Sequence, residues 1–262
     1  MYVDVIVSVV LAALLVLVTL KKKAFTPAAA ISAAVILIIA GICGSYAAIV
    51  GVLSAYGIIF VVDIVLGART EKITGEINRK TGRRDIVQVM ANALAAVIAL
   101  VLGKIFNSPV GIVIYYSALT ECLADSLASD VGVLSRKDPI DICRMKRIKR
   151  GLSGGVSLLG TVSALLGCVA MSLISMIFWG FDLKYFLAIL AVPMIGILID
   201  SVLGSLVQAK YQCTECGKFT EKAVHCGKPT RHSGGLRIIN NDVVNIISNF
   251  SSAAIAALFL LL

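Results

Sequence analysis

Residues 2–23 decide the fold class, and they read YVDVIVSVVLAALLVLVTLKKK. A helix needs about 20 predominantly apolar residues to cross the hydrocarbon core of a bilayer. Residues 2–20 meet that requirement, and three lysines follow them directly. The stretch lacks the basic start and the small-residue cleavage site of a signal peptide, so we interpret it as a retained first membrane span.

The rest of the chain has the same character. Of its 262 residues, 59% are hydrophobic and only 15% are charged, and the mean hydropathy is +0.97. So much apolar surface cannot be buried inside a water-soluble domain, and its solvent must be lipid. Because lipid-exposed backbone must satisfy its own hydrogen bonds, the predicted fold is all-α, a polytopic transmembrane helix bundle. About eight spans are expected, at residues 2–20, 27–43, 45–66, 86–103, 110–129, 155–178, 184–209 and 238–262.

The lysine and arginine residues predict the orientation. Twenty-two of the 24 lie in the segments 21–23, 67–85, 130–150 and 210–237. With alternating spans these segments share one side of the membrane, which the positive-inside rule makes cytoplasmic. Both termini are then outside, and the plasma membrane of a prokaryote is the expected location. This topology signal explains the net charge of +9, and nothing else in the sequence indicates nucleic-acid binding.

The two halves of the chain resemble each other. Residues 62–68, VDIVLGA, match residues 199–205, IDSVLGS, and residues 85–88, DIVQ, match residues 242–245, DVVN. We therefore predict a single integral membrane domain over residues 1–262. It would consist of two parallel four-helix halves, at about 1–105 and 106–262, with a shared site between them. The second half carries an inserted cytoplasmic loop at residues 210–237, which we call the Cys/His loop. Chance similarity between apolar helices is the alternative.

Several carboxylates lie within or beside the predicted spans. A carboxylate in a membrane span is costly unless it is paired, hydrated or bound to a cation. Asp63 and Glu121 are expected to pair with a nearby Lys or Arg. Other carboxylates converge at the cytoplasmic ends of the spans, as a site for magnesium and phosphates requires. Ion pairing at the interface is the alternative for these as well. The candidate catalytic and Mg²⁺-binding residues are Asp125, Asp130, Asp200 and Asp242.

Residues 144–157, RMKRIKRGLSGGVS, combine a basic run, a glycine turn and the start of a span. We call this stretch the glycine loop. Glycines let backbone N–H groups approach an anion, and a helix N-terminus adds positive potential. A phosphate cradle is therefore expected, although the stretch is not a Walker A motif. The alternative is close packing of a small-residue helix start against a neighbouring helix. The candidate phosphate ligands are Ser153, Gly154, Gly155 and Ser157, with Arg83, Arg84, Arg136, Arg147 and Arg150 as charge-neutralising groups.

Amide side chains gather at the starts of the fourth and eighth predicted spans. They recur at helical spacing after Asp85 and beside Asp242, so that they share a helical face in each span. Amides can hydrogen-bond across helices as purely structural contacts, and they can also bind a nucleotide or a sugar. The candidate nucleotide-binding residues are Gln88, Asn92, Asn241 and Asn245.

The Cys/His loop contains the sequence Cys213-Thr214-Glu215-Cys216, then His225-Cys226 and His232. One CxxC pair with a third cysteine and an available histidine can complete a four-coordinate, structural zinc site. The candidate zinc ligands are Cys213, Cys216, His225, Cys226 and His232. Reduced free thiols in a cytoplasmic loop are the alternative.

Five motifs occur in order along nearly the whole chain, at residues 82–92, 124–135, 151–160, 200–208 and 241–245. Together they resemble the phytyl phosphate kinase family, the integral membrane family of vitamin E salvage. The resemblance implies that a nucleoside triphosphate, CTP above all, donates a phosphoryl group to an isoprenoid monophosphate. The acceptor would be phytyl or geranylgeranyl phosphate, and the product would be its diphosphate. Asp130 and Leu152 depart from the family pattern, which usually has Glu and Thr at these places.

The resemblance agrees with the chemistry of the residues. Phosphoryl transfer needs positioning, magnesium and positive charge rather than covalent help from the protein. A prenyl tail belongs in the lipid and a nucleotide in the cytoplasm, so the active site is expected at the cytoplasmic membrane interface.

Three other functions use some of the same features. A nucleotidyltransferase that forms a CDP-lipid would need the same ingredients and would release pyrophosphate. A membrane transporter of an anionic substrate would also use parallel repeats and intramembrane acids. A non-catalytic assembly factor would have no evident use for the acids and amides.

Overall fold

The computed structural model describes residues 2–75, 77, 82–180 and 182–262. Arg79 and Lys80, which contribute to the basic segment 67–85, lie outside the described residues. The described part has seven helices that are long and apolar enough to cross a membrane. They are α1 (Tyr2–Lys21), α2 (Pro27–Thr74), α3 (Ile86–Ile105), α4 (Val110–Gly132), α5 (Leu158–Trp179), α6 (Leu183–Leu206) and α7 (Asn241–Leu261).

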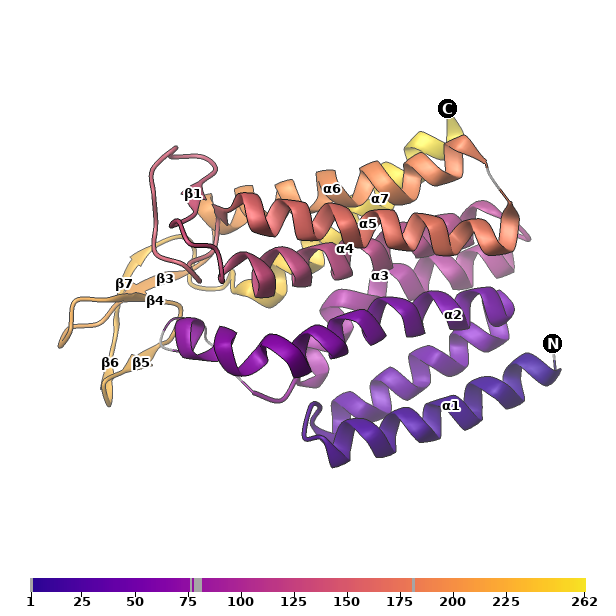
Figure 1. The fold of residues 1–262 in the computed structure, drawn as a ribbon, viewed down its shortest axis with the longest axis horizontal. Helices are drawn as coiled ribbons and strands as arrows, with labels where there is room; N and C mark the ends of the chain where they lie inside the picture. Colours follow the sequence, from indigo (N-terminus) through magenta and orange to yellow (C-terminus); the bar gives the residue numbers. More distant parts are fainter. Residues whose placement is uncertain (1, 76, 78–81, 181) are drawn as a thin grey trace.

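Helix α2 is broken at Ser45. Its 48 residues exceed the length of one membrane crossing, and Ser45 has the non-helical angles φ 57° and ψ −164°. Figure 1 shows the chain turning back within α2, so that two arms run beside each other. The break coincides with the predicted boundary between the spans 27–43 and 45–66. A count of eight spans requires both arms to cross the bilayer, and it stays a prediction.

The helices begin at capping side chains. Thr26 caps α2 ahead of Pro27, and Ser157 caps α5. Asp85 caps α3 in a reciprocal capping box, in which the side chain of Gln88 accepts from the Asp85 amide. Each cap satisfies a backbone N–H that has no partner within its own helix.

The cap of α7 is Asn240, two residues before Asp242. In the sequence comparison Asp242 was matched with Asp85, which is itself the cap of α3. The two matched stretches therefore occupy different positions in their helices, and the internal repeat stays a prediction.

Helix α4 is the centre of the bundle and contacts α2, α3, α5, α6 and α7. Near the Ser45 break, the hydroxyl groups of Tyr115 and Tyr116 donate hydrogen bonds of 2.7 Å to the carbonyls of Ala48 and Ala47. Both tyrosines are fully buried. These contacts join α4 to the turn of α2 near one end of the bundle. Both chain termini lie at this end, and we call it the terminal end (Figure 1).

The opposite end holds short strands in the loops between helices (Figure 1). They form two two-stranded sheets, β1–β2 and β5–β6, and one three-stranded sheet in the order β4–β3–β7, all antiparallel. We call this the basic end. Strands of two to four residues leave no periodic pattern in a sequence, and the prediction did not include them. They are β1 (Ile140–Asp141), β2 (Gly155–Val156), β3 (Lys210–Gln212), β4 (Phe219–Thr220), β5 (Val224–His225), β6 (Lys228–Pro229) and β7 (Arg231–Gly234).

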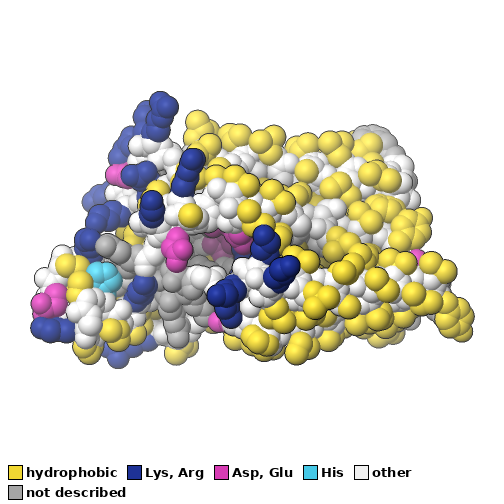
Figure 2. Space-filling model, turned by 60° about the horizontal axis from the view of Figure 1, so that its bottom comes forward, with side chains coloured by type: hydrophobic (Ala, Val, Ile, Leu, Met, Phe, Trp, Pro, Cys, Tyr) yellow, Lys and Arg dark blue, Asp and Glu magenta, His cyan; other side chains and the backbone are white. Residues whose placement is uncertain are grey.

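The surface has two zones. Figure 2 shows Lys and Arg side chains gathered at the basic end and hydrophobic side chains over most of the remaining surface. Large apolar residues such as Leu14, Leu166 and Leu198 are exposed on the outer helices. An apolar belt with charge concentrated at one end suits a bundle whose helices are surrounded by lipid.

Candidate functional site

A cavity of about 1130 Å³ lies at the basic end, between the helix ends and the loops. Asn92, on α3, and Met194, on α6, are among the lining residues nearest the middle of the bundle. Figure 2 shows acidic side chains in a hollow bordered by Lys and Arg. The cavity therefore joins the apolar bundle to the charged loops.

Most of the predicted site residues line this cavity. They are Arg84, Gln88, Asn92, Asp125, Asp130, Arg150, Ser153, Gly154, Gly155, Ser157, Asp200, Asn241, Asp242 and Asn245. Arg83, Arg136 and Arg147 are exposed and do not line it. Five motifs spread over 164 residues of sequence thus converge on one space, but the three outlying arginines do not reach it.

Asp125 and Asp200 are the innermost acids of the cavity, on α4 and α6. Their charges lie close enough to interact unfavourably. In the described part of the chain, no Lys or Arg forms an ion pair with either carboxylate, and the nearest hydroxyl partner of Asp200 is that of Ser248, at 3.5 Å. Two like charges in a half-buried setting favour a bound cation between them.

Arg84 lines the same cavity, and its charge acts on Asp125. Its guanidinium pairs with Asp63 at 3.2 Å, which confirms the expected ion pair of Asp63. Burial lowers the pKa of Arg84, but the carboxylates of Asp63 and Asp130 outweigh burial and hold it above its ordinary value. Two backbone hydrogen bonds with Ala24 and Thr26 fix the segment that carries it. Arg84 is therefore a fixed positive charge in the cavity wall.

Glu121 does not follow the prediction. It is 2% exposed, it lies outside the cavity lining, and no Lys or Arg pairs with it in the described residues. The amide of Asn249 donates to its Oε2 at 2.6 Å instead. The expected ion pair is wrong, because α7 supplies an amide partner that the spacing along α4 could not reveal.

Two residues of the glycine loop, Gly154 and Ser157, make close contacts with neighbouring helices. Gly154 has φ 86°, and a Cβ on it would lie 2.5 Å from the backbone nitrogen of Ser205 on α6. Ser157 caps α5 and donates to the carbonyl of Gly132 at 3.2 Å. The alternative of close helix packing is therefore correct for Gly154 and Ser157, although both still line the cavity.

Asp141, which the sequence did not single out, holds the glycine loop in place. Its carboxylate accepts from the amides of Cys143 and Arg144 and from the Ser205 hydroxyl, at 3.1, 2.9 and 2.6 Å. Burial raises the pKa of Asp141, but these hydrogen bonds to the charged form outweigh burial and keep the pKa below its ordinary value. The loop is thereby anchored to the end of α6.

The amides make mostly structural contacts. Gln88 completes the capping box of α3, and Asn245 donates to Asn92 at 3.2 Å, which joins α7 to α3. Within the described residues, Oδ1 of Asn245 is buried without a hydrogen-bond partner. Asn245 therefore keeps an acceptor that a ligand in the cavity could use.

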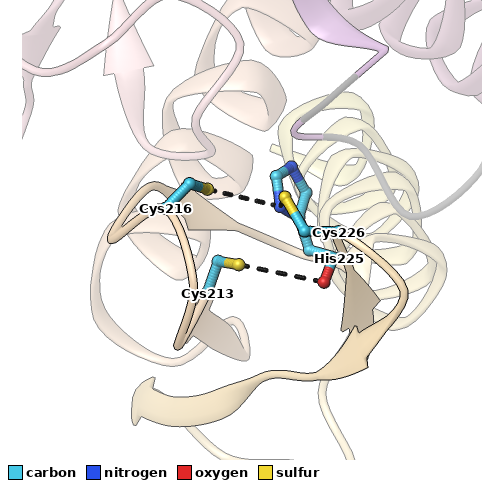
Figure 3. Close-up of side chains that lie close together, drawn as sticks. All are labelled: Cys213, Cys216, His225 and Cys226. Carbon is cyan, nitrogen blue, oxygen red and sulfur yellow. Dashed lines mark hydrogen bonds between the residues drawn. The ribbon is translucent and has the colours of Figure 1, made fainter.

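The Cys/His loop brings four of its five candidate ligands together (Figure 3). The ligand atoms of Cys213, Cys216, His225 and Cys226 all lie within 4.8 Å of one another. The amide of Cys216 is the main cause that lowers the pKa of Cys213 to about 6. His232 is not in the group, and its ring contacts the ring of Tyr211 edge-on at 5.6 Å.

The Cys/His loop also touches the cavity. Thr220 and Glu221 both bond to the carbonyl of Ile77, and Lys222 donates to the carbonyl of Gly75. The Glu221 carboxylate accepts from the hydroxyl of Ser153, and burial raises the pKa of Glu221. Hydroxyl and carboxylate side chains inside a basic segment look solvated in a sequence, so Glu221 gave no signal.

A model of the integral membrane protein family DUF92 matches residues 10–253 of the chain. The chain belongs to this family. It is similar to Protein PGR from Arabidopsis thaliana, with 27% identity over 74% of this chain and 77% of the relative. It is also 28% identical to an uncharacterised membrane protein of Methanocaldococcus jannaschii, over 48% of this chain and 52% of the relative. No solved structure is similar to it.

The charge of the cavity in this DUF92 member limits what it can bind. Of the described residues that line it, seven are acidic and five are basic. When all of these side chains are ionised, the lining has an excess of negative charge. A phosphate group is repelled by such a lining unless a divalent cation binds with it.

Proposed function

We propose that this membrane protein is a kinase that transfers a phosphoryl group from a nucleoside triphosphate to an isoprenoid monophosphate. The resemblance of the five motifs names CTP as donor and phytyl or geranylgeranyl phosphate as acceptor. The observation that carries the proposal is the pair Asp125 and Asp200, which line one wide cavity between apolar helices and basic loops and whose charges repel each other.

The position of the cavity supports a substrate that is partly lipid. Apolar side chains line its inner part, among them Phe60, Met194 and Ile197, while Lys22, Lys23 and Arg237 line its mouth. A prenyl chain fits the apolar side, and the phosphates of a nucleotide fit the basic side. A single pocket can therefore bring both substrates together without moving the lipid into water.

The acidic residues of the cavity support the proposal that the protein binds Mg²⁺. Mg²⁺ usually keeps several waters and binds one or two carboxylates together with substrate phosphates. In the described chain, the Cys/His group is the only set of three or more potential ligands close enough to hold one ion, so the acids form no complete protein cage. We assign Asp125 and Asp200 to Mg²⁺, with Asp130 and Asp242 as further candidates in the lining of the same cavity. The bound ion would offset the charge of the donor phosphates.

The other requirement of the reaction is to position the substrates and to offset their charge. Arg84 is the fixed cation beside the acids, and it is suited to offset the charge that builds up on the transferred group. Arg150 lies in the glycine loop directly before Gly151, and its guanidinium contacts the Asp138 carboxylate at 3.6 Å and the carbonyl of Ser135 at 3.1 Å. The acceptor is already an anionic phosphate oxygen, so no general base is required.

Transport is the less favoured function. The residues that line the cavity come from the basic half of the bundle, and at the terminal end two buried hydrogen bonds join α4 to the turn of α2. A path for a translocated substrate would need polar residues at both ends.

The test is a product assay with purified protein in nanodiscs, supplied with Mg²⁺, CTP and geranylgeranyl phosphate. We expect geranylgeranyl diphosphate and CDP. Asp125→Asn should reduce the rate by about 100-fold or more, since it removes a charge that acts at the transferred phosphates. Asp182→Asn is the matched control, because Asp182 caps α6 at the terminal end and Asn is an equally good cap.

Three outcomes would contradict the proposal. Pyrophosphate release with formation of a CDP-lipid would identify a nucleotidyltransferase. Uptake of a prenyl phosphate or nucleotide into proteoliposomes without any product would identify a transporter. Wild-type turnover in Asp125→Asn would remove Asp125 from the mechanism.

A further inference from the structure

We propose that Cys213, Cys216, His225 and Cys226 bind one structural Zn²⁺ ion, which fastens the Cys/His loop beside the cavity. The four ligand atoms lie within 4.8 Å of one another, and they point toward a common centre (Figure 3). Three thiolates and one imidazole are a ligand set of structural zinc sites, in which all four positions are taken by protein.

Two distances between ligand atoms can be compared with those expected around a tetrahedral zinc ion. With zinc bonds of about 2.3 Å to sulfur and 2.0–2.1 Å to nitrogen, ligand atoms should be about 3.6 to 3.8 Å apart. Nδ1 of His225 lies 3.5 Å from the sulfur of Cys216, close to this range, and 3.2 Å from the sulfur of Cys226, which is shorter. A neutral imidazole nitrogen can form a good hydrogen bond with one thiol. A metal ion bound by all three groups explains why two sulfur atoms lie close to the same nitrogen.

The two turns that carry the ligands have the same tripeptide sequence and a similar glycine conformation. Cys216-Gly217-Lys218 and Cys226-Gly227-Lys228 repeat one tripeptide at a spacing of ten residues. Both glycines have positive φ, 68° and 73°, which favours glycine for lack of a Cβ. Gly217 lies in the turn between β3 and β4, and Gly227 in the turn between β5 and β6. Two hairpin turns thus present two ligands each.

The loop needs such a link because it has little core of its own. Its strands are two to four residues long, and Phe219 and Val224 are exposed. Isolated short hairpins are at best marginally stable, whereas metal binding contributes directly to the folding free energy of a small domain. Cys213 is the buried member of the ligand set, and its amide bonds to the carbonyl of Lys218.

The ion would act on the cavity through Glu221. This residue follows β4 and accepts from Ser153 of the glycine loop, and Gln208 donates to the same hydroxyl at 2.8 Å. Thr220, its neighbour, bonds to the end of α2 through Ile77 at 2.9 Å. Zinc would therefore hold one wall of the cavity in place. This consequence rests on the proposed function, but the binding of zinc does not.

The first experiment that tests this proposal measures the metal content of the purified protein. Full-length protein is extracted from membranes, purified in metal-depleted buffer, and analysed for zinc, iron and copper by mass spectrometry. We expect roughly one zinc ion per chain. Cys216→Ser and His225→Gln should lose most of it. Cys143→Ser and His232→Gln are matched controls outside the ligand set, and they should keep it.

A second measurement keeps the proposal testable if a ligand variant fails to fold. Wild-type protein is exchanged with Co²⁺, and its absorption spectrum is recorded. Strong tetrahedral bands together with thiolate-to-metal charge transfer are expected. An octahedral spectrum, a metal-free wild-type protein, iron in place of zinc, or equal zinc loss in the His232→Gln control would each overturn the site. None of these readouts depends on kinase activity.

Discussion

The two candidate metal sites of this protein are built in opposite ways. In the Cys/His loop, four ligand atoms from two hairpins lie within 4.8 Å of one another. In the cavity, Asp125 and Asp200 come from different helices, and in the described chain no third acid joins them closely enough to form such a set. The first site is complete in the folded chain, whereas the second offers only part of a coordination shell.

This difference agrees with the two tasks that we propose. A structural ion must be bound before the loop is stable, so the chain supplies every ligand. A magnesium ion in phosphoryl transfer arrives with the nucleotide, and the phosphates supply the missing oxygens. An enzyme that closed this shell with its own side chains would leave no position for its substrate.

The largest expected effect separates the two sites by mutation. Asp200→Asn should lower kcat by about 100- to 1000-fold, because it removes a charge next to the transferred group. The zinc content should not change. Initial rates over a range of Mg²⁺ concentrations and metal analysis of the same sample provide the measurement. A variant that keeps its activity, or one that loses its zinc, would break the distinction.

Arg83 and Arg84 provide a sharper test within the cavity. Arg84 lies in the lining and pairs with Asp63, whereas its neighbour Arg83 is exposed outside the cavity. Arg84→Gln should lower kcat/KM by about 10- to 100-fold, the value of a charge-assisted hydrogen bond. Arg83→Gln should stay within about twofold.

Arg84→Lys controls for the structural role of Arg84. It keeps the charge, so it should recover part of the loss if charge matters. Equal losses in the Arg83 and Arg84 variants would show that both arginines act only through the overall positive charge of the basic end.

The contact between the two sites should give an intermediate effect. Ser153→Ala and Glu221→Gln alter the two partners of one hydrogen bond, so their effects on thermal stability should not add. We expect a coupling of about 1 kcal/mol from a double-mutant cycle. In protein stripped of zinc the coupling should vanish, because the Cys/His loop is no longer held against the glycine loop. Additive effects in the zinc-bound protein would mean that the two regions are independent.

The smallest expected effect concerns pH. The pKa of Asp141 is below its ordinary value, so its charged form stabilises the fold above the unfolded-state pKa, and this contribution is lost as pH falls through the folded-state pKa. Asp141→Asn should therefore lower the unfolding temperature at pH 7 and lower it less as the pH approaches about 3.8 or below. Thermal unfolding of both proteins at several pH values tests this. A constant difference between pH 7 and pH 3 would contradict it.

The sequence predicts the membrane part of this protein well. The apolar runs locate the helices, and even the break at Ser45 falls between two predicted spans, because hydropathy and length determine where a helix can cross a bilayer. The convergence of the five motifs on one cavity also follows the prediction. Hydropathy contains no information about partners on other helices, so it could not show that Asn249 satisfies Glu121.

The loops were harder to predict for a physical reason. Asp141 and Glu221 lie among Lys and Arg, where an acid is usually solvated. Each of them nevertheless accepts a hydrogen bond from a distant segment, Asp141 from the Ser205 hydroxyl and Glu221 from the Ser153 hydroxyl. Gly154 looked like a phosphate ligand, but the close approach of Ser205 gives a second reason for glycine there. Local sequence shows what a residue can do, and only the tertiary fold shows which neighbour it meets.

The tyrosine contacts at the terminal end have a consequence for the broken helix α2. The hydroxyl groups of Tyr115 and Tyr116 donate to the carbonyls of Ala48 and Ala47, which follow the turn at Ser45. Each of these two carbonyls therefore has a protein partner instead of water. Two buried hydrogen bonds thus hold the broken helix against the central helix α4, at the end of the bundle opposite the cavity.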